Sequence, residues 1–512
     1  MKTFTKDSLI VASRQELTDI ILDQAAQIDK LSNTITEHSM QLEWLKRQMF
    51  GTKSERFVEP DDLQTALELG IVKNDVHVTE TTTITYDRKK NTGAQEPVKG
   101  HGRGAMPTHL PIKKTTVEPQ EDTTDMVKIG EEESWYYEMD KPASLHIVLI
   151  SRPKYALPDK SGVVIGTLPA LPVEKGNAGP GLLAHVVTEK YLYHMPLDRQ
   201  RKKFKHEYNV EFSPSWLSDN VGSTVFWLEP VYDKYQELLL KSTYLQGDET
   251  PIQVLLRDGR GKTHKGYLWV YHDPIQRIVL FDYRESRSHK GPSEFLKNFH
   301  GTLQIDGYEG YADIIAKNGL VHAGCMDHVR RRFDKALPFD KTRAAHALET
   351  MKTWYMVERE AKELNLSFDE RLALRKEKVA ESMAAFKIWM QQQLTEVLPK
   401  SPIGVAIQYA LNQWEYFNPY LSDGRIELSN ILIENAIRPV TLGRKNFLFA
   451  GSHNAARWPA VIYSLAAIAK NHGINPFDYF KELLTELPKA TTSDLGKFLI
   501  PEWKPKPAIV YV

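Results

Sequence analysis

The chain has almost none of the residues that build cross-links and metal clusters. Its 512 residues include a single cysteine, Cys325. One cysteine excludes an intrachain disulfide framework and any zinc site that needs several cysteines. Long apolar runs are also missing, since the longest near the C-terminus, residues 460–469, is too short to span a bilayer. The N-terminus lacks the basic-then-apolar pattern of a secretory signal, so we expect a cytoplasmic protein with no membrane partner.

The net charge of the chain at pH 7 is zero. Basic and acidic residues number 66 each, whereas most nucleic-acid binders carry a basic surplus. The basic residues are clustered, however, and local stripes can bind phosphates while the total stays neutral. Solvated helix faces are the alternative interpretation of these clusters, which lie at residues 46–56, 199–205, 330–332 and 438–445. A hydrophobic content of 41% and a charged content of 26% are those of a globular protein, and the length predicts two to four domains.

Residues 1–57 are predicted to form one long helix with an apolar seam. Seam residues alternate spacings of four and three from Leu17 to Met49, the 3.5-residue period of a left-handed coiled coil. Polar Gln24 and His38 in the seam could fix register and partner number. We favour self-association into a homo-oligomer; a single amphipathic helix packed on the rest of the protein is the alternative. Residues 58–106 are polar and poor in large aliphatic side chains, which indicates a linker.

Two further segments precede the centre of the chain. Residues 107–178 are expected to form a small β-rich module, with strands at 146–150 and 162–169. Residues 179–242 are expected to be helical and to have helix–turn–helix character.

In that helical pair, Ser213 is the expected N-cap and Pro214 the first residue of the second helix. DNA binding and a plain helical hairpin fit the pattern equally well. The candidate DNA-binding residues of the first helix are Arg201, Lys202 and Lys203.

Residues 243–460 are predicted to form an α/β domain. Strands are expected at 243–248, 266–272 and 277–283, followed by a helix, a strand at 302–308, a short helix and a strand at 320–325. This is the ribonuclease-H-like order, in which the first and fourth strands are neighbours. Residues 341–397 contain no glycine or proline, so an all-helical insertion is expected at about 338–425. A C-terminal helical segment, residues 461–512, completes an α/β multidomain fold.

Three acidic residues occupy positions that this fold would bring together. Asp248 and Asp306 end the first and fourth strands, and Glu434 is expected in the middle of a later helix, which Pro439 should disrupt. Carboxylates on rigid neighbouring elements can hold two divalent cations about 4 Å apart, as metal-dependent phosphoryl transfer requires. Each acid alone could be a turn or surface residue, but their joint placement favours one site.

His322, Cys325 and His328 are spaced by three residues and suggest a zinc site. A fourth ligand is missing, and a strand-to-helix transition rarely brings such side chains together. We therefore expect no zinc, a buried thiol at Cys325 and a histidine that lines the site. One or two of the arginines at 330–332 are expected to contact phosphate.

Several of these segments resemble the DDE transposases of the insertion-sequence sixty-six family, and the resemblance covers nearly the whole chain. It rests on GDETPIQVL at 247–255, LQIDGYEGY at 303–311, CMDHVRRRFDKA at 325–336 and IENAIRPVTLGRKNFLFAGS at 433–452. It implies a bacterial, nucleoid-associated enzyme that cuts transposon ends and joins them to target DNA. The catalytic and metal-binding residues would be Asp248, Asp306 and Glu434, with two Mg²⁺ or Mn²⁺ per active site.

The resemblance also implies phosphate contacts around that site and accessory transposition proteins as further partners. The candidate contacts are His328, Arg331, Arg438, Arg444 and Lys445. The family usually carries a small cysteine-rich zinc-binding module between the N-terminal helix and the helix–turn–helix region. This chain departs from that pattern, because residues 100–180 contain no cysteine. Any module at 107–178 is thus expected to have lost its metal. The alternatives are a catalytically silent DNA-binding or assembly protein derived from a transposase, and a structural coiled-coil protein.

Overall fold

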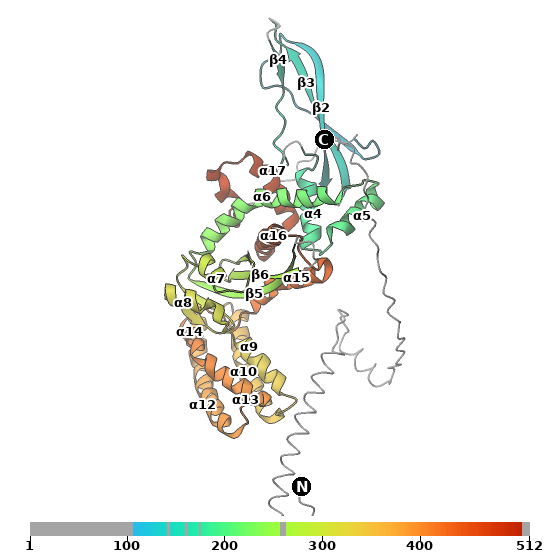
Figure 1. Cartoon of the computed structure of the whole chain (residues 1–512). Coiled ribbons are helices and arrows are strands. Elements are labelled where there is room, and N and C mark those ends of the chain that lie inside the picture. The colour runs from blue at the N-terminus through green and yellow to red at the C-terminus, as the bar shows by residue number, and fades with distance from the viewer. Residues whose placement is uncertain (1–105, 141–143, 159–161, 174–175, 257–262, 504–512) are drawn as a thin grey trace, which may run out of the picture. The chain divides into compact units, whose positions relative to one another are not determined.

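The computed structural model describes residues 106–140, 144–158, 162–173, 176–256 and 263–503, which all belong to one compact unit, residues 99–512 (Figure 1). The predicted coiled-coil helix and nearly all of the predicted linker lie outside the described residues. No helix in the described part of the chain is both long enough and apolar enough to cross a membrane.

The first sheet contains four strands. They are β1 (Ile112–Thr116), β2 (Val127–Asp140), β3 (Ser144–Ala156) and β4 (Val163–Ile165). β3 lies between β1 and β2 and also pairs with β4; only the β1–β3 pairing is parallel. β3 and β4 contain or fall within the two predicted strand segments, whereas β1 and β2 are additional. Buried Met139, Leu145 and Ile147 attach this sheet to the main core.

Three helices follow: α4 (Pro180–Tyr191), α5 (Leu197–Tyr208) and α6 (Pro214–Leu239). The predicted start of α6 is confirmed, because the Ser213 side chain accepts a hydrogen bond from the Trp216 amide. α6 continues for 26 residues, and side chains such as Leu217 and Leu228 are fully buried. The second helix of the predicted pair is therefore a core helix that packs on the central sheet and on a C-terminal helix.

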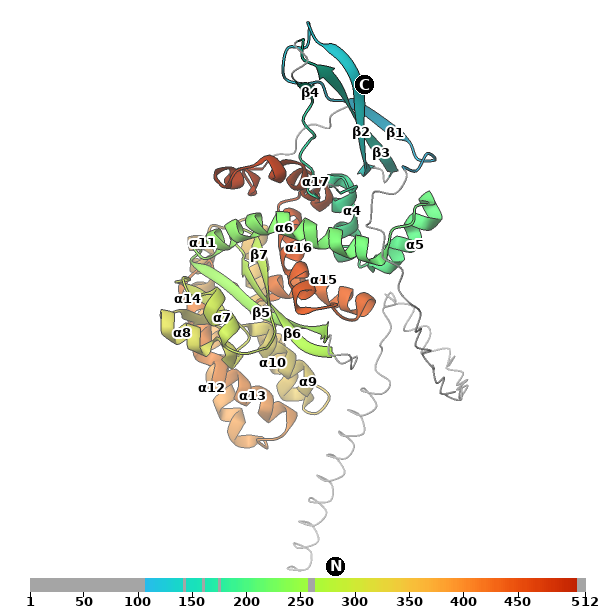
Figure 2. The same ribbon diagram turned by 45° about the horizontal axis from the view of Figure 1, so that its top comes forward.

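The central sheet has five strands: β5 (Tyr244–Leu255), β6 (Thr263–Asp273), β7 (Ile278–Arg284), β8 (Thr302–Gln304) and β9 (Val321–Ala323). Their order is β7-β6-β5-β8-β9, with antiparallel pairing from β7 to β5 and parallel pairing from β5 to β9. Figure 2 labels β5, β6 and β7 of this sheet. The predicted adjacency of the first and fourth strands is confirmed. Between the strands lie α7 (Lys290–Phe295), η1 (Glu309–Tyr311) and α8 (Ala312–Asn318).

Two strand ends predicted for the central sheet are wrong. β8 stops at Gln304 and not at residue 308, so Asp306 lies beyond the strand, and β5 runs past residue 248. β5 does not end at Asp248 but continues to Leu255, because alternate side chains such as Ile252 and Val254 remain buried. β8 pairs only with Tyr244–Gln246, while β6 pairs with Gln246–Leu255. Asp248 thus lies mid-strand, just past the point where β8 leaves β5. Pro251 is tolerated farther along because that edge of β5 needs no ladder donor.

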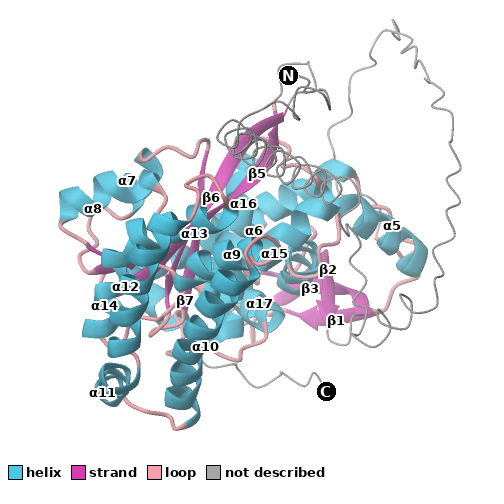
Figure 3. Cartoon of the chain, turned by 90° about the horizontal axis from the view of Figure 1, so that it is seen from below, coloured by secondary structure: helices cyan, strands magenta, loops and turns pink. Residues whose placement is uncertain are grey.

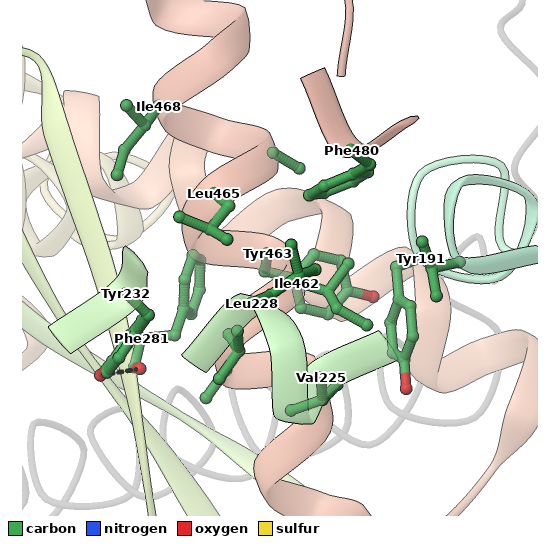
Figure 4. Close-up of a cluster of buried hydrophobic side chains, with 14 of the residues drawn as sticks. Tyr191, Val225, Leu228, Tyr232, Phe281, Ile462, Tyr463, Leu465, Ile468 and Phe480 are labelled. Atoms are coloured by element: carbon green, nitrogen blue, oxygen red, sulfur yellow. Dashed lines mark hydrogen bonds between the residues drawn. The ribbon is translucent and has the colours of Figure 1, made fainter. Parts of the chain in front are cut away.

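The main core lies between the central sheet and helices α6 and α16 (His453–Asn471) (Figure 4). Leu228 and Ile462 meet across the two helices there, and the Tyr232 hydroxyl donates to the Phe281 carbonyl at 2.8 Å. α16 runs across the expected segment boundary at 460. It is followed by α17 (Pro476–Glu486), η3 (Leu487–Lys489) and η4 (Thr492–Phe498).

The segment after β9 is helical, as predicted for the insertion. It contains α9 (Met326–Ala336), α10 (Lys341–Glu363), α11 (Phe368–Lys378), α12 (Ala380–Glu396), α13 (Pro402–Gln413), η2 (Trp414–Phe417) and α14 (Asn418–Ser422). These helices pack side by side (Figure 3) around a second core that includes Met351, Trp354 and Phe386. The insertion therefore has an apolar interior of its own.

The last element of the site is α15 (Ile431–Phe447). The prediction that Pro439 disrupts this helix is wrong, because α15 continues through it. Proline removes one backbone hydrogen bond within a helix, and buried side chains on both sides can offset that cost. Here Ile437 and Val440 are buried on either side of Pro439.

Candidate active site

Asp248 is a partly buried acid without a counter-charge. Its carboxylate accepts a hydrogen bond from the Glu249 amide at 2.7 Å, and no cationic side chain of the described residues pairs with it. Burial raises the pKa of Asp248 to about 8, and the negative charges of Glu249, Asp306 and Glu434 add to that rise. The other two predicted acids therefore lie within electrostatic range of Asp248.

Asp306 lies two residues beyond β8, in a turn that fixes its side chain. Its Oδ1 accepts a hydrogen bond from the Tyr308 amide at 3.0 Å, and the intervening Gly307 has φ +85°. His328 Nε2 lies 3.8 Å from Asp306 Oδ2. The Tyr409 hydroxyl, on insertion helix α13, donates to the Asp306 carbonyl at 2.9 Å. The helical insertion thus supports the turn that carries the second acid.

Glu434 lies in the first turn of α15, so its predicted mid-helix placement is wrong. Arg331 on α9 donates a hydrogen bond to its Oε1. A link between the starts of the two helices brings this pair together. The thiol of Cys325, the residue that caps α9, donates to the side-chain oxygen of Asn430, the residue that caps α15, at 2.9 Å.

A buried polar network fixes the segment that enters α15. Gln304 Nε2 donates to the carbonyls of Gly324 and Glu427, both at 2.8 Å. Gln246 Nε2 donates to Gln304 Oε1 at 3.0 Å and to the Ser429 carbonyl at 3.3 Å. Buried polar groups need such partners, so these bonds specify where the chain leads into the helix that carries Glu434. The signal in the sequence was a glutamine inside each of two apolar strands, two residues before Asp248 and two residues before Asp306.

A second acid on β5 was missed by the sequence analysis. Glu249 is almost fully buried and accepts a hydrogen bond from Arg287 Nε at 2.8 Å. The Arg287 guanidinium also lies 3.8 Å from the ring centroid of Tyr308, whose hydroxyl donates to the Arg287 carbonyl at 2.7 Å. Arg287 therefore neutralises Glu249, which leaves Asp248 as the uncompensated acid. Nothing in the sequence pattern singled out Arg287.

The remaining predicted DNA contacts lie on α15 and α5. Arg444 Nη1 donates to Thr250 Oγ1 at 2.9 Å and to the Pro251 carbonyl, so it ties the last turn of α15 to β5. Arg438 and Lys445 are exposed on the same helix. On α5, Arg201 and Lys202 form ion pairs of 3.0 and 2.8 Å with Asp198. Lys203 is half-buried on that helix.

His322, Cys325 and His328 have separate partners. His322 stacks on Tyr416 with ring centroids 3.7 Å apart, and His328 faces Asp306. Cys325 is a core thiol whose pKa burial raises to about 12. Among the described residues, no group of three His, Cys, Asp or Glu side chains is arranged to hold a metal ion. That includes Asp248, Asp306 and Glu434 as they stand, with Glu434 bonded to Arg331. Their chemistry nevertheless suits a hard divalent cation, because all three offer carboxylate oxygens and Asp248 has no counter-charge.

Comparison with known proteins identifies the group to which these features belong. Residues 175–458, more than half of the chain, match the model of the family described as Transposase IS66 family. The chain belongs to the IS66 transposase family. A second model, described as Transposase C of IS166 homeodomain, matches residues 39–114. All three acids lie within the first match.

Curated relatives of this IS66-family chain match over most of their length. The uncharacterized protein y4qI of Sinorhizobium fredii is 30% identical over 487 residues, which cover 91% of this chain and 88% of the relative. The uncharacterized protein y4jD of the same organism is 28% identical over 506 residues, covering 93% and 96%. Family membership assigns the chain a transposase-related function.

Proposed function

We propose that the chain is an active DNA transposase that cleaves transposon ends and joins them to target DNA. Asp248, Asp306 and Glu434 form its catalytic site. The observation that carries the proposal is that Asp306 and Glu434, which lie far away in the sequence, are within electrostatic range of the partly buried Asp248, which has no counter-charge. Such a cluster of like charges is costly unless a cation joins it. Outside a functional site, selection for stability would favour neutral residues at these positions.

The proposal includes a ribonuclease-H-like catalytic domain. Its support is the strand order β7-β6-β5-β8-β9, with a parallel β5–β8 pair next to an antiparallel β5–β6 pair. The domain extends over residues 243–460, and α16 contributes to its core from beyond that limit. Residues 107–178 and 179–242 precede it as a small β-rich module and a helical DNA-binding region.

Asp248, Asp306 and Glu434 would hold Mg²⁺ or Mn²⁺. Such a cation, when bound, polarises phosphate oxygens and lowers the pKa of a bound water. The chain's own residues position the substrate. Arg331 must leave Glu434 before that acid can bind a cation, and its guanidinium can then pair with a DNA phosphate bidentately. His328, on the same helix as Arg331, lies next to Asp306.

The reaction has two displacements at phosphorus. Water first replaces the 3′ oxygen of a phosphodiester at the transposon end, which leaves a free 3′-hydroxyl. That hydroxyl then attacks a phosphodiester of target DNA. The 3′ oxygen of the target strand is displaced from the phosphorus and leaves as a free 3′-hydroxyl. Both displacements break one P–O bond and form another, so no oxidant or energy source is needed.

The test uses DNA from the inverted repeats that flank the coding region. Asp306→Asn should retain binding to this DNA and lose Mg²⁺-dependent cleavage by more than about a hundredfold, since even residues that only support metal ligands contribute 10–100-fold. Asp334→Asn is the matched control, because Asp334 is exposed on α9 and outside the site. Cleavage that survives in Asp306→Asn would show that the triad is assigned wrongly. Wild-type protein that binds the ends without cutting them would instead favour a silent derivative.

A further inference from the structure

A pocket of about 560 Å³ lies beside β5, apart from the three acids. Its size is within the range of small-ligand sites. Ile252 forms part of its wall and follows Asp248 by four residues along β5, a separation of about 13 Å. The other walls come from α4, the start of α5, α6, the end of α15, the loop after it and the first turns of α16. Its lining includes two basic and three aromatic residues: Lys190, Arg444, Phe447, Phe449 and Trp458.

Two cations face this pocket. Lys190 Nζ lies 5.3 Å from the ring centroid of Tyr191 and 5.4 Å from that of Phe447, and no carboxylate of the described residues pairs with it. Burial lowers the pKa of Lys190 to about 8, so the amine is still largely protonated at neutral pH. Arg444 is held against β5 through Nη1 and is a lining residue of the pocket. The one acid of the lining, Asp219, is exposed.

A strained turn carries an aromatic side chain to the same pocket. Leu448 has φ +55°, and the Phe449 amide donates to the Phe447 carbonyl at 2.5 Å, which closes a tight three-residue turn. Ala450 then bonds to β5 through the Gln253 carbonyl at 2.8 Å. This anchoring leaves the Phe449 side chain 44% exposed. Such positive-φ turns in branched residues cost energy and are concentrated at binding sites.

We propose that the pocket binds one unpaired nucleotide of the DNA strand that the carboxylate site processes, with its base against an aromatic wall and its phosphate near Lys190. This inference rests on the proposed function. Aromatic faces next to cations are the combination that single-stranded DNA requires, because each nucleotide has a π-face and a negative charge. Enzymes that act on DNA can hold a base outside its helix in a pocket of this kind.

The test measures binding of the full-length protein to a duplex with a short single-stranded 3′ overhang, and to the same duplex with abasic overhang positions. Phe449→Ala should weaken binding of the intact overhang about tenfold and leave binding of the abasic overhang unchanged, since it removes one stacking contact. Phe368→Ala is the matched control, because Phe368 is also 44% exposed but lies on α11 of the insertion. An intact-to-abasic affinity ratio that Phe449→Ala does not change would refute the pocket.

A second measurement tests the phosphate contact without relying on the strained turn. Lys190→Met keeps the apolar stem and removes the charge, and it should reduce the slope of log affinity against log salt by about one for the intact overhang. An unchanged slope would show that Lys190 meets no phosphate and would refute the assignment. These assays involve no cleavage. If both binding assays contradict the pocket while cleavage still depends on Asp306, the proposed function therefore remains valid.

Discussion

Glu358 is the centre of a buried charge cluster in the helical insertion, and its replacement should unfold that insertion preferentially. It accepts hydrogen bonds from Arg371 Nε at 2.8 Å, Arg375 Nε at 2.7 Å and the Tyr420 hydroxyl at 2.6 Å. Arg375 is fully buried, so in a Glu358→Gln variant its charge would have no carboxylate partner. Removing one member of a buried ion pair costs about 3–5 kcal/mol.

The contribution of Glu358 to stability depends on pH, and the direction of that dependence follows from its pKa. Burial works to raise the pKa of Glu358, but the hydrogen bonds and charges of Arg375 and Arg371 outweigh it, so the pKa lies below its usual 4.5. A lowered pKa in the folded state gives stability that is present above pH 4.5 and lost as the pH falls through the folded value. Acidification should thus weaken the wild-type insertion and change the Glu358→Gln variant less.

The assay is amide hydrogen exchange of the full-length protein, read over α10–α14 and over β5–β7 separately. We expect Glu358→Gln to lower protection in the insertion by about 3 kcal/mol or more and to leave the central sheet almost unchanged. Glu349→Gln is the control, because Glu349 is 74% exposed and its pair with Lys352 spans 3.5 Å; such pairs contribute at most about 1 kcal/mol. A loss in Glu358→Gln no larger than in the control would refute the reasoning.

Two further predictions concern the Asp306 turn and the N-terminal segment. Gly307→Ala would strain a turn residue with φ +85° and place its Cβ 2.7 Å from the end of the Gln413 side chain, and the resulting shift of Asp306 should reduce DNA cleavage about a hundredfold. Gly319→Ala shares a positive φ but has open space around it, so comparable loss of cleavage there would contradict this account. Replacement of both Ile28 and Leu31 by Asp should lower the mass measured by light scattering if residues 1–57 form a coiled coil, and an unchanged mass would exclude that role.

The sequence predicted the order of elements in the central sheet because each strand has its own apolar pattern and turn residues. It also predicted the N-cap at Ser213, which is a local feature. Strand length was harder to predict. β5 continues past Asp248 because β6 pairs with it throughout, and that pairing is a long-range property.

The partners of the acids could not be read from the sequence at all. Arg331 and Glu434 meet because a thiol, an amide and two buried glutamines align the starts of α9 and α15, and those bonds join residues far apart in the chain. The same limit applies to Arg444. Its position in a basic cluster suggested DNA, whereas in the structure Nη1 binds Thr250 and Pro251.

Helix α15 connects events at its two ends. Its first turn carries Glu434, and ten residues later, about 15 Å along the axis, Arg444 is fastened to β5. A helix transmits small rotations over such a length unless it bends, and Pro439 lies between the two ends as a natural bending point. Release of Glu434 from Arg331 would therefore either turn the wall of the proposed nucleotide pocket with it or be absorbed as a bend at Pro439. Mutation of this proline would change how strongly strand capture and assembly of the acids depend on each other.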